Sequence, residues 1–175
     1  MDKIRVTSGK FKGRSIDSPK SNKTHPMGSR EKIALFNMIS DYLPDAEVLD
    51  AFAGSGALGI EAFSRGAKYV DYIEKDLGVA QILIKNLASL GIGSAEINIM
   101  DANKFKLNKS YDVIIADPPY DKFNIKPIIH LTKFLKNGGV FVLSHPDETP
   151  VIPDLDLTKT RKYAKAHISI YQKSA

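Results

Sequence analysis

Short apolar runs alternate with longer amphipathic stretches from Glu47 onward, which predicts strands alternating with helices. The segment from Lys136 to Gly139 combines a lysine, an asparagine and two glycines, which indicates a helix end followed by a strand start. This alternation favours one parallel, doubly wound sheet with right-handed crossovers. The expected strands cover residues 47–51, 69–74, 95–99, 111–116 and 139–144, with helices near 57–65, 77–90 and 124–136.

The segments on either side of this alternation have different patterns. Residues 4–16 are rich in strand formers, with Gly9 and Gly13 as turn points, and predict a β-hairpin; residues 17–28 predict a linker or substrate-facing loop. Ser29 is expected to cap a helix that reaches about Tyr42 and either covers one edge of the sheet or contacts a cofactor directly. Its apolar positions are Ile33, Leu35, Phe36, Ile39 and Leu43.

The last part of the chain predicts an antiparallel hairpin at the sheet edge. Two short strand-like runs occur between Thr158 and Gln172, one around Tyr163 and one at residues 168–171. His145 and His167 are isolated, and we interpret both as structural or loop residues.

A glycine-rich turn follows the first strand of the alternating region. Gly54, Gly56 and Gly59 have the G-x-G-x-x-G spacing between an apolar run and a helical stretch, which indicates a nucleotide-binding turn. Asp50 ends the strand before it, and Glu74 ends the next strand at the interval typical of a carboxylate that binds ribose hydroxyls. Alone, this pattern also fits a dehydrogenase or a packed strand-to-helix turn.

The tetrapeptide Asp117-Pro118-Pro119-Tyr120 follows the strand expected at 111–116. Two prolines there form a rigid corner lined by carbonyl groups, between a carboxylate and an aromatic ring. It matches the (D/N)-P-P-(Y/F) signature of methyltransferases that modify an exocyclic or amide nitrogen. Asp101 also falls just beyond a strand end, so four acidic residues are expected on the rim where such sheets bind ligands.

The charge of the chain is concentrated near its start. Residues 1–40 hold nine Lys and Arg residues against three acidic residues, a net charge of +6, whereas the rest of the chain carries −1. A basic segment on a balanced domain predicts a nucleic-acid partner, with Lys10, Lys12 and Arg14 on one face of the hairpin contacting phosphates. With 175 residues, no cysteine and no long apolar run, we expect one main domain with an appendage, in the cytoplasm.

With these motifs in place, the chain resembles the RsmD-type methyltransferases, which modify N2 of a guanine in bacterial 16S ribosomal RNA, of the guanine(966)-N2 type. The resemblance covers most of the chain, from V-T-S-G-K-F-K-G-R-S-I through A-G-S-G-A-L-G-I-E-A and I-I-A-D-P-P-Y to R-K-Y-A-K-A-H-I-S-I-Y. It implies a Rossmann-like class I fold with a seven-stranded, mainly parallel sheet, an antiparallel C-terminal hairpin and a small N-terminal β-hairpin. The implied division is 1–28 for RNA contact and 29–175 for the methyltransferase domain.

The resemblance also assigns roles to residues. The implied cofactor is S-adenosylmethionine. The implied partner is 16S ribosomal RNA or an assembling small ribosomal subunit. We expect a monomer that binds neither a metal nor a membrane. The catalytic residues are expected to be Asp117, Pro118 and Tyr120. The cofactor is expected to contact Asp50, Phe52, Gly54, Gly56, Glu74, Lys75, Asp101 and Ala102, and the RNA to contact Lys10, Lys12, Arg14, Arg30, Pro119 and Tyr120.

The chain departs from the family pattern at two places. His25-Pro26-Met27 stands where the family usually shows R-P-T, and Lys32-Ile33 replaces an R-E pair. Both places lie outside the glycine turn and the D-P-P-Y motif, so they bear on RNA contacts more than on methyl transfer.

Several other functions share parts of the pattern. D-P-P-Y also occurs in enzymes that methylate adenine N6 or cytosine N4 of DNA, although this short chain has no large target-recognition insert. Protein-glutamine methyltransferases usually have Asn where Asp117 stands. An NAD-binding oxidoreductase would need a substrate domain and a catalytic constellation that the sequence does not reveal, and a non-catalytic RNA-binding module would leave D-P-P-Y and the rim carboxylates unexplained.

Overall fold

The computed structural model describes residues 2–19, 27–163 and 166–175. A seven-stranded sheet with the order β5-β4-β3-β6-β7-β9-β8 forms its centre, and the N-terminal strands form a separate two-stranded sheet. The central strands are β3 (Glu47–Asp50), β4 (Tyr69–Ile73), β5 (Ile97–Asn98), β6 (Tyr111–Ala116), β7 (Leu135–His145), β8 (Leu155–Lys162) and β9 (His167–Lys173). Strands β3 to β7 are parallel, whereas β9 runs antiparallel to both of its neighbours, β7 and β8. The predicted fold class is therefore confirmed.

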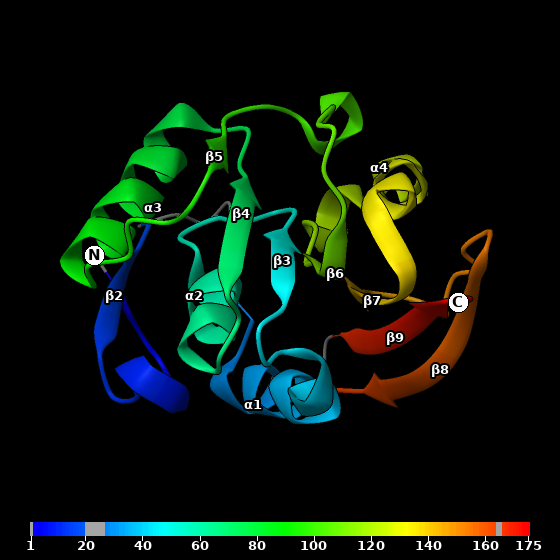
Figure 1. The fold of residues 1–175 in the computed structure, drawn as a ribbon, viewed down its shortest axis with the longest axis horizontal. Helices are drawn as coiled ribbons and strands as arrows, with labels where there is room; N and C mark the ends of the chain where they lie inside the picture. The colour runs from blue at the N-terminus through cyan, green and yellow to red at the C-terminus, as the bar shows by residue number, and fades with distance from the viewer. Residues whose placement is uncertain (1, 20–26, 164–165) are drawn as a thin grey trace.

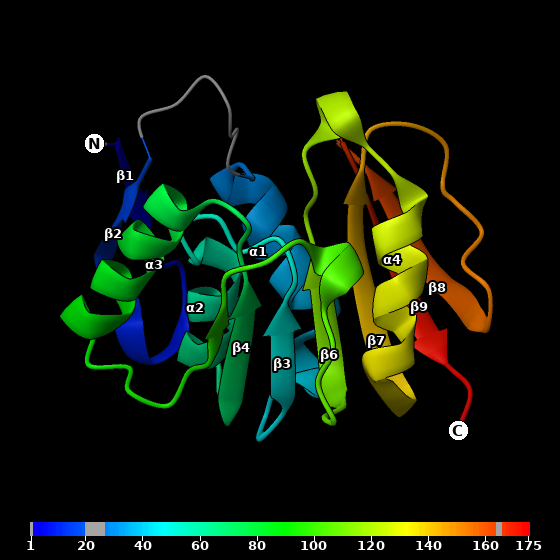
Figure 2. The ribbon, with the colours of Figure 1, turned by 90° about the horizontal axis from the view of Figure 1, so that it is seen from above.

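Helices cover both faces of the central sheet (Figures 1 and 2). In β6, Val113 and Ile115 belong to one core and Ile114 and Ala116 to the other, because successive side chains of a strand point to opposite faces. The first core also contains buried apolar residues of α1 (Ser29–Met38), α2 (Ala57–Ser64) and α3 (Leu77–Ser89), and the second contains buried apolar residues of α4 (Ile125–Leu131).

The N-terminal hairpin packs on the first core. Its strands are β1 (Asp2–Arg5) and β2 (Ser15–Ser18), joined by a connection that contains the 3₁₀ turn η1 (Gly9–Phe11). The pairing runs from Asp2–Ser18 to Arg5–Ser15, so the hairpin reaches beyond the expected range 4–16 at both ends. Residues 6–14 form the connection, in which Val6 and Phe11 are buried in the core of the main domain. Lys10, Lys12 and Arg14 therefore do not alternate along one strand, which corrects that prediction. The expected loop at 17–28 begins after β2, and residues 20–26, with His25 and Pro26, lie outside the described residues.

Helix α1 differs from its prediction at both ends. Its N-cap is Gly28, without a side-chain hydrogen bond, rather than Ser29, and the helix ends at Met38 before the 3₁₀ turn η2 (Ser40–Tyr42). The side chain of Ile33 is 41% exposed, because the buried face of α1 is formed by its neighbours Lys32, Leu35 and Phe36. The helix lies on a face of the sheet as part of the first core, not only at an edge.

The helix expected at 124–136 is shorter, and the strand after it is longer. Helix α4 ends at Leu131, the 3₁₀ turn η5 (Thr132–Phe134) follows, and β7 begins at Leu135. Leu135 pairs with Tyr111, and an irregularity in the β6–β7 register follows. Gly138, with φ 73°, takes up this irregularity within β7, so the two glycines do not separate a helix from a strand.

His145 and His167 are neighbours at the ends of β7 and β9. The two residues pair in register, and their ring centroids lie 5.4 Å apart. The Nε2 atom of His145 lies 2.8 Å from Oγ of Ser169, and burial lowers the pKa of this histidine. Both histidines therefore have packing roles where β7 meets the C-terminal hairpin, in agreement with the expected structural role.

Candidate active site at the carboxyl edge of the sheet

The glycine turn between β3 and α2 uses its three glycines in different ways. Gly54 and Gly56 have φ values of 54° and 85°, which L side chains rarely adopt. A Cβ atom on Gly59 would lie 2.3 Å from the ring of Tyr72, so this glycine lets α2 pack closely against β4. A Cβ atom on Gly54 would meet no other atom within 4 Å, which shows that this part of the turn borders open space. The turn can therefore present its backbone to a ligand.

Asp50 ends β3 directly below this turn and is only 1% exposed. Its Oδ2 atom accepts a hydrogen bond of 2.8 Å from the amide of Gly59, whereas the buried Oδ1 atom has no partner. Burial raises the pKa of Asp50 to about 7, and the charges of Asp117 and Glu74 add to this increase. Such a carboxylate is suited to a cationic group, which would satisfy its free oxygen and offset its desolvation.

Glu74 follows β4 and is bonded to the same turn. Its Oε2 atom accepts from the amide of Gly54 at 2.9 Å, and its Oε1 atom accepts from the amide of Asp76 at 2.8 Å. A carboxylate has further lone pairs on both oxygens, so Glu74 can also accept hydrogen bonds from a pair of hydroxyl groups. Lys75, which follows it, is exposed.

The remaining predicted cofactor residues come from the turn and from the segment after β5. Asp101 is exposed and caps the 3₁₀ turn η3 (Ala102–Lys104), because its side chain accepts a 2.8 Å hydrogen bond from the amide of Asn103. Ala102 is buried in the second core, and Phe52 packs partly against that core. Of the three predicted cofactor residues Phe52, Asp101 and Ala102, Asp101 is therefore the one with an accessible polar group.

The D-P-P-Y segment directly follows β6. Pro118 is buried and Pro119 exposed, while Asp117 and Tyr120 are half-buried. Burial raises the pKa of Asp117 to about 6, although hydrogen bonds from Ser144 and Tyr120 counteract it. The hydroxyls of Tyr120 and of Ser144, on β7, also share a short hydrogen bond, which uses one of their two protons, so only one of them donates to Asp117 at a time. Sequence reasoning missed Ser144, whose only signal is a hydroxyl at the end of an otherwise apolar strand.

The carboxyl edge of the sheet thus holds Asp50, Glu74, Asp101 and Asp117, as expected from the order of the strands. Helix α1 also begins near this edge. Burial raises the pKa of Tyr120 to about 12, and the charges of Asp117 and of Glu31, in the first turn of α1, contribute. Arg30 is exposed in that same turn.

The three basic residues of the hairpin connection, Lys10, Lys12 and Arg14, lie at the amino edge of the sheet, where its parallel strands begin. The backbone of Gly9 packs against the carbonyl of Ser64, the last residue of α2, and Arg14 donates a 3.2 Å hydrogen bond to the carbonyl of Ser89, the last residue of α3. Both helices start near the carboxyl edge and end at the amino edge, and Figure 2 shows the connection between β1 and β2 beside their ends. Lys10, Lys12 and Arg14 are therefore not brought together with Asp117.

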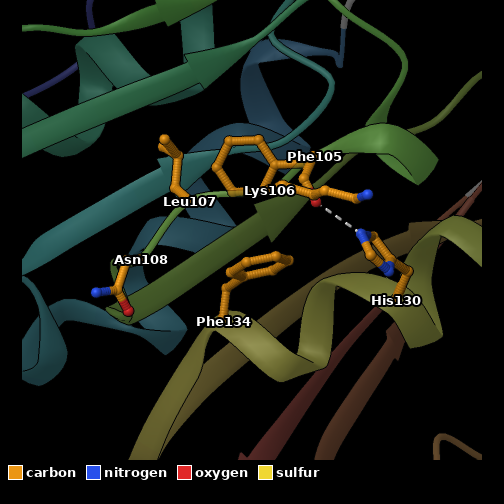
Figure 3. A pocket seen from close by; sticks show the side chains of 6 residues that line it. All are labelled: Phe105, Lys106, Leu107, Asn108, His130 and Phe134. Atoms are coloured by element: carbon orange, nitrogen blue, oxygen red, sulfur yellow. Dashed lines mark hydrogen bonds between the residues drawn. The ribbon is translucent and has the colours of Figure 1, made fainter.

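A separate pocket lies between α4 and the segment before β6 (Figure 3). Its lining includes Phe105 and Phe134, whose ring centroids are 4.9 Å apart, and His130, whose Nε2 atom lies 2.8 Å from the carbonyl oxygen of Phe105. None of the predicted site residues lines it. Within residues 2–19, 27–163 and 166–175, no cluster of three metal-ligating side chains is found, and no helix is long and apolar enough to span a membrane.

Comparisons with known proteins point to one family. The model of the family described as "Conserved hypothetical protein 95" matches residues 4–172. The chain is 39% identical to "Ribosomal RNA small subunit methyltransferase D" of Escherichia coli K12, with 98% of this chain and 91% of the relative covered. The protein of the same name from Haemophilus influenzae is 33% identical, over 86% of this chain and 83% of its own length.

A solved structure shows the same fold over the whole chain. The Escherichia coli protein yhhF superimposes with a TM-score of 0.90 at 31% identity, with 99% of both chains covered. The family model and the relatives together cover the glycine turn, the D-P-P-Y segment and the C-terminal hairpin. The chain therefore belongs to the RsmD family of methyltransferases.

Proposed function

We propose that this chain transfers a methyl group from S-adenosylmethionine to the exocyclic N2 of a guanine in small-subunit ribosomal RNA. Family membership supports the coarser statement, a ribosomal RNA methyltransferase that uses S-adenosylmethionine. The observation that carries the choice of an amino nitrogen is the D-P-P-Y corner, which lies beside Asp50 and the glycine turn at one edge of the sheet. Methylation of DNA and NAD-dependent oxidation are less favoured, because the relatives are named as ribosomal RNA methyltransferases.

The residues at this edge fit the cofactor. Asp50 has a buried oxygen without a partner, which suits the ammonium group of the methionyl part, and Gly54 leaves open space for close approach to the backbone. Glu74 would accept hydrogen bonds from the ribose hydroxyls, and Asp101 from the adenine amino group. When bound, S-adenosylmethionine supplies an electrophilic methyl group on a sulfonium.

Asp117 is expected to act on the nucleophile. The lone pair of a guanine N2 is delocalised into the ring, so the nitrogen must be oriented and its developing positive charge stabilised. The Asp117 carboxylate and the Pro118 carbonyl would accept the two amino hydrogens, and one of these protons leaves the nitrogen after transfer. With a pKa of about 6, Asp117 is mostly ionised at pH 7.5 and can accept that proton. Tyr120 would stack on the base while Ser144 holds its hydroxyl.

Transfer of a labelled methyl group tests this proposal. Small subunits and protein-free small-subunit RNA, both from cells that lack the modification, are incubated with S-adenosylmethionine, and the product nucleoside is identified by mass spectrometry. We expect N2-methylguanosine at one site with the wild type. The Asp117→Ala variant should lose about 10²-fold or more in kcat, with little change in S-adenosylhomocysteine affinity.

The exposed residue Asp121, four positions along the same segment, provides the matched control, and Asp121→Ala should keep normal turnover. Normal turnover of Asp117→Ala on saturating RNA would remove Asp117 from the mechanism. A methylated nucleoside other than N2-methylguanosine would move the proposal to another nitrogen. A monomeric state, a cytoplasmic location and the division of the chain at residue 28 remain predictions.

A further inference from the structure

The strand β8 forms the edge of the central sheet that lies opposite the N-terminal hairpin (Figure 1). All its residues except the first are exposed, and its second half carries Lys159, Arg161 and Lys162. Among the described residues, none of these three cations has a salt-bridge partner within 4.0 Å. The charges of this strand are therefore available to a partner in solution.

The register of the sheet places these cations at the level of the D-P-P-Y segment. Ala116 pairs with Leu143 on β7, Leu143 pairs with Ser169 on β9, and Ser169 pairs with Thr160 on β8. Arg161 is therefore level with Asp117, three strands away. At about 4.8 Å per strand, this separation is about 14 Å along the sheet.

The strand is held firmly in this position. The hydroxyl of Thr160 lies 2.9 Å from that of Ser169, and Thr158 donates a 3.0 Å hydrogen bond to the carbonyl of Ile170. Tyr163, directly after the strand, packs against the first core. The three cations are thus presented on a rigid support rather than on a loop.

The three cations of β8 do not all project from the same face of the sheet. Lys159 and Arg161 pair with Ile170 and Ile168, which belong to the first core, so both point to the face that carries α1. Arg30 lies in the first turn of α1, next to Glu31, whose charge acts on Tyr120. Lys162 points to the other face.

An acidic rim requires such flanking cations if its substrate is a polyanion. The accessible rim carboxylates Glu74, Asp101 and Asp117 repel phosphates. The basic residues of the hairpin connection lie at the amino edge of the sheet, away from this rim. We propose that Lys159, Arg161 and Lys162 of β8, with Arg30 of α1, bind backbone phosphates of the RNA on one side of the target guanine. This inference rests on the proposed function and adds the surface that holds the substrate.

The competing explanation is that the charges only protect an exposed sheet edge from pairing with another chain. The test is a variant with Lys159→Gln, Arg161→Gln and Lys162→Gln together. The matched control carries Lys68→Gln, Lys85→Gln and Lys133→Gln, which removes the same charge from exposed positions elsewhere. RNA affinity is measured at several salt concentrations, together with methyl transfer, S-adenosylhomocysteine affinity and the oligomeric state.

We expect the β8 variant to bind RNA at least tenfold more weakly at 0.15 M salt. The slope of log affinity against log salt should fall by about 2, as expected for three lost contacts to a single strand. Its kcat on saturating RNA and its S-adenosylhomocysteine affinity should match those of the control. If the β8 variant has the same salt slope as the control, the inference is overturned, whether or not the variant dimerises. It is also overturned if the salt slope falls only in a variant in which Lys10 and Lys12 are neutralised. If the wild type itself methylates no RNA, the proposed function fails instead.

Discussion

Glu61 of α2 joins the N-terminal segment to the main domain, and its removal should destabilise the protein strongly. Its side chain is fully buried and accepts hydrogen bonds from the amide and hydroxyl of Thr7 and from the amide of Ser8. It also forms ion pairs of 2.8 Å with Arg65 and 3.3 Å with Lys32. Burial alone would raise the pKa of Glu61, but the bonds from Thr7 and Arg65 and the charge of Lys32 lower it, so this carboxylate is ionised at neutral pH.

The magnitude follows from the buried charge that the change leaves behind. In Glu61→Ala, the ammonium group of Lys32, only 2% exposed, retains its 2.8 Å hydrogen bond to the carbonyl of Arg5 but loses its counter-charge. Breaking a buried pair by removing one partner costs about 3–5 kcal/mol. For a chain of this size, each kcal/mol corresponds to about 2–4 °C, so the melting temperature should fall by about 6–20 °C.

Urea unfolding followed by circular dichroism measures this loss. Glu96→Ala, at an exposed position, is the control and should stay within about 0.5 kcal/mol of the wild type. A double-mutant cycle with Lys32→Met then isolates the pair, because the neutral side chain removes the stranded charge and should recover part of the loss. A cost below about 1 kcal/mol for Glu61→Ala would refute the argument that this buried network stabilises the fold.

Two further predictions concern the cofactor side of the site. Because the pKa of Asp50 is raised to about 7, the stability it contributes is present at low pH and is lost as the pH rises from about 4 to 7. The wild type should therefore lose stability relative to Asp50→Asn over this pH range in urea titrations. The affinity of the wild type for S-adenosylhomocysteine, measured by calorimetry, should rise over the same pH range. An affinity that does not change with pH would contradict the assignment of Asp50 to the cofactor site. Gly59→Ala should cost about 1–3 kcal/mol in thermal unfolding, because the new Cβ would lie 2.3 Å from Tyr72, whereas Gly93→Ala, with open space around it, should cost less than 1 kcal/mol.

The parts of this structure that follow from local patterns could be predicted from the sequence. The strands β3, β4 and β6 are short apolar runs between turn signals, and their observed bounds agree with the predicted ones within a residue. The acidic rim was also predictable, because parallel order brings the carboxyl ends of strands to the same edge. The assigned contacts of these residues with cofactor and RNA stay predictions.

Other features depend on contacts between distant segments. The hairpin connection is positioned by Phe11, which packs in the core, and by Ser64, whose hydroxyl accepts a hydrogen bond from the amide of Phe11. No periodicity within residues 4–16 reveals these contacts. The early start of β7 likewise depends on the pairing of Leu135 with Tyr111 and on the backbone freedom of Gly138.

The position of β9 between β7 and β8 imposes an order on folding. Strand β8 precedes β9 in the sequence, yet its hydrogen-bonded neighbour in the sheet is β9 alone. During synthesis, β8 therefore has no neighbouring strand to pair with until β9 has been made and has paired with β7. The glycine turn and the D-P-P-Y corner can form earlier, since β3, β4 and β6 pair with one another directly. The surface that we propose for RNA would thus be completed last, so a nascent chain would acquire its cofactor site before it can hold its substrate.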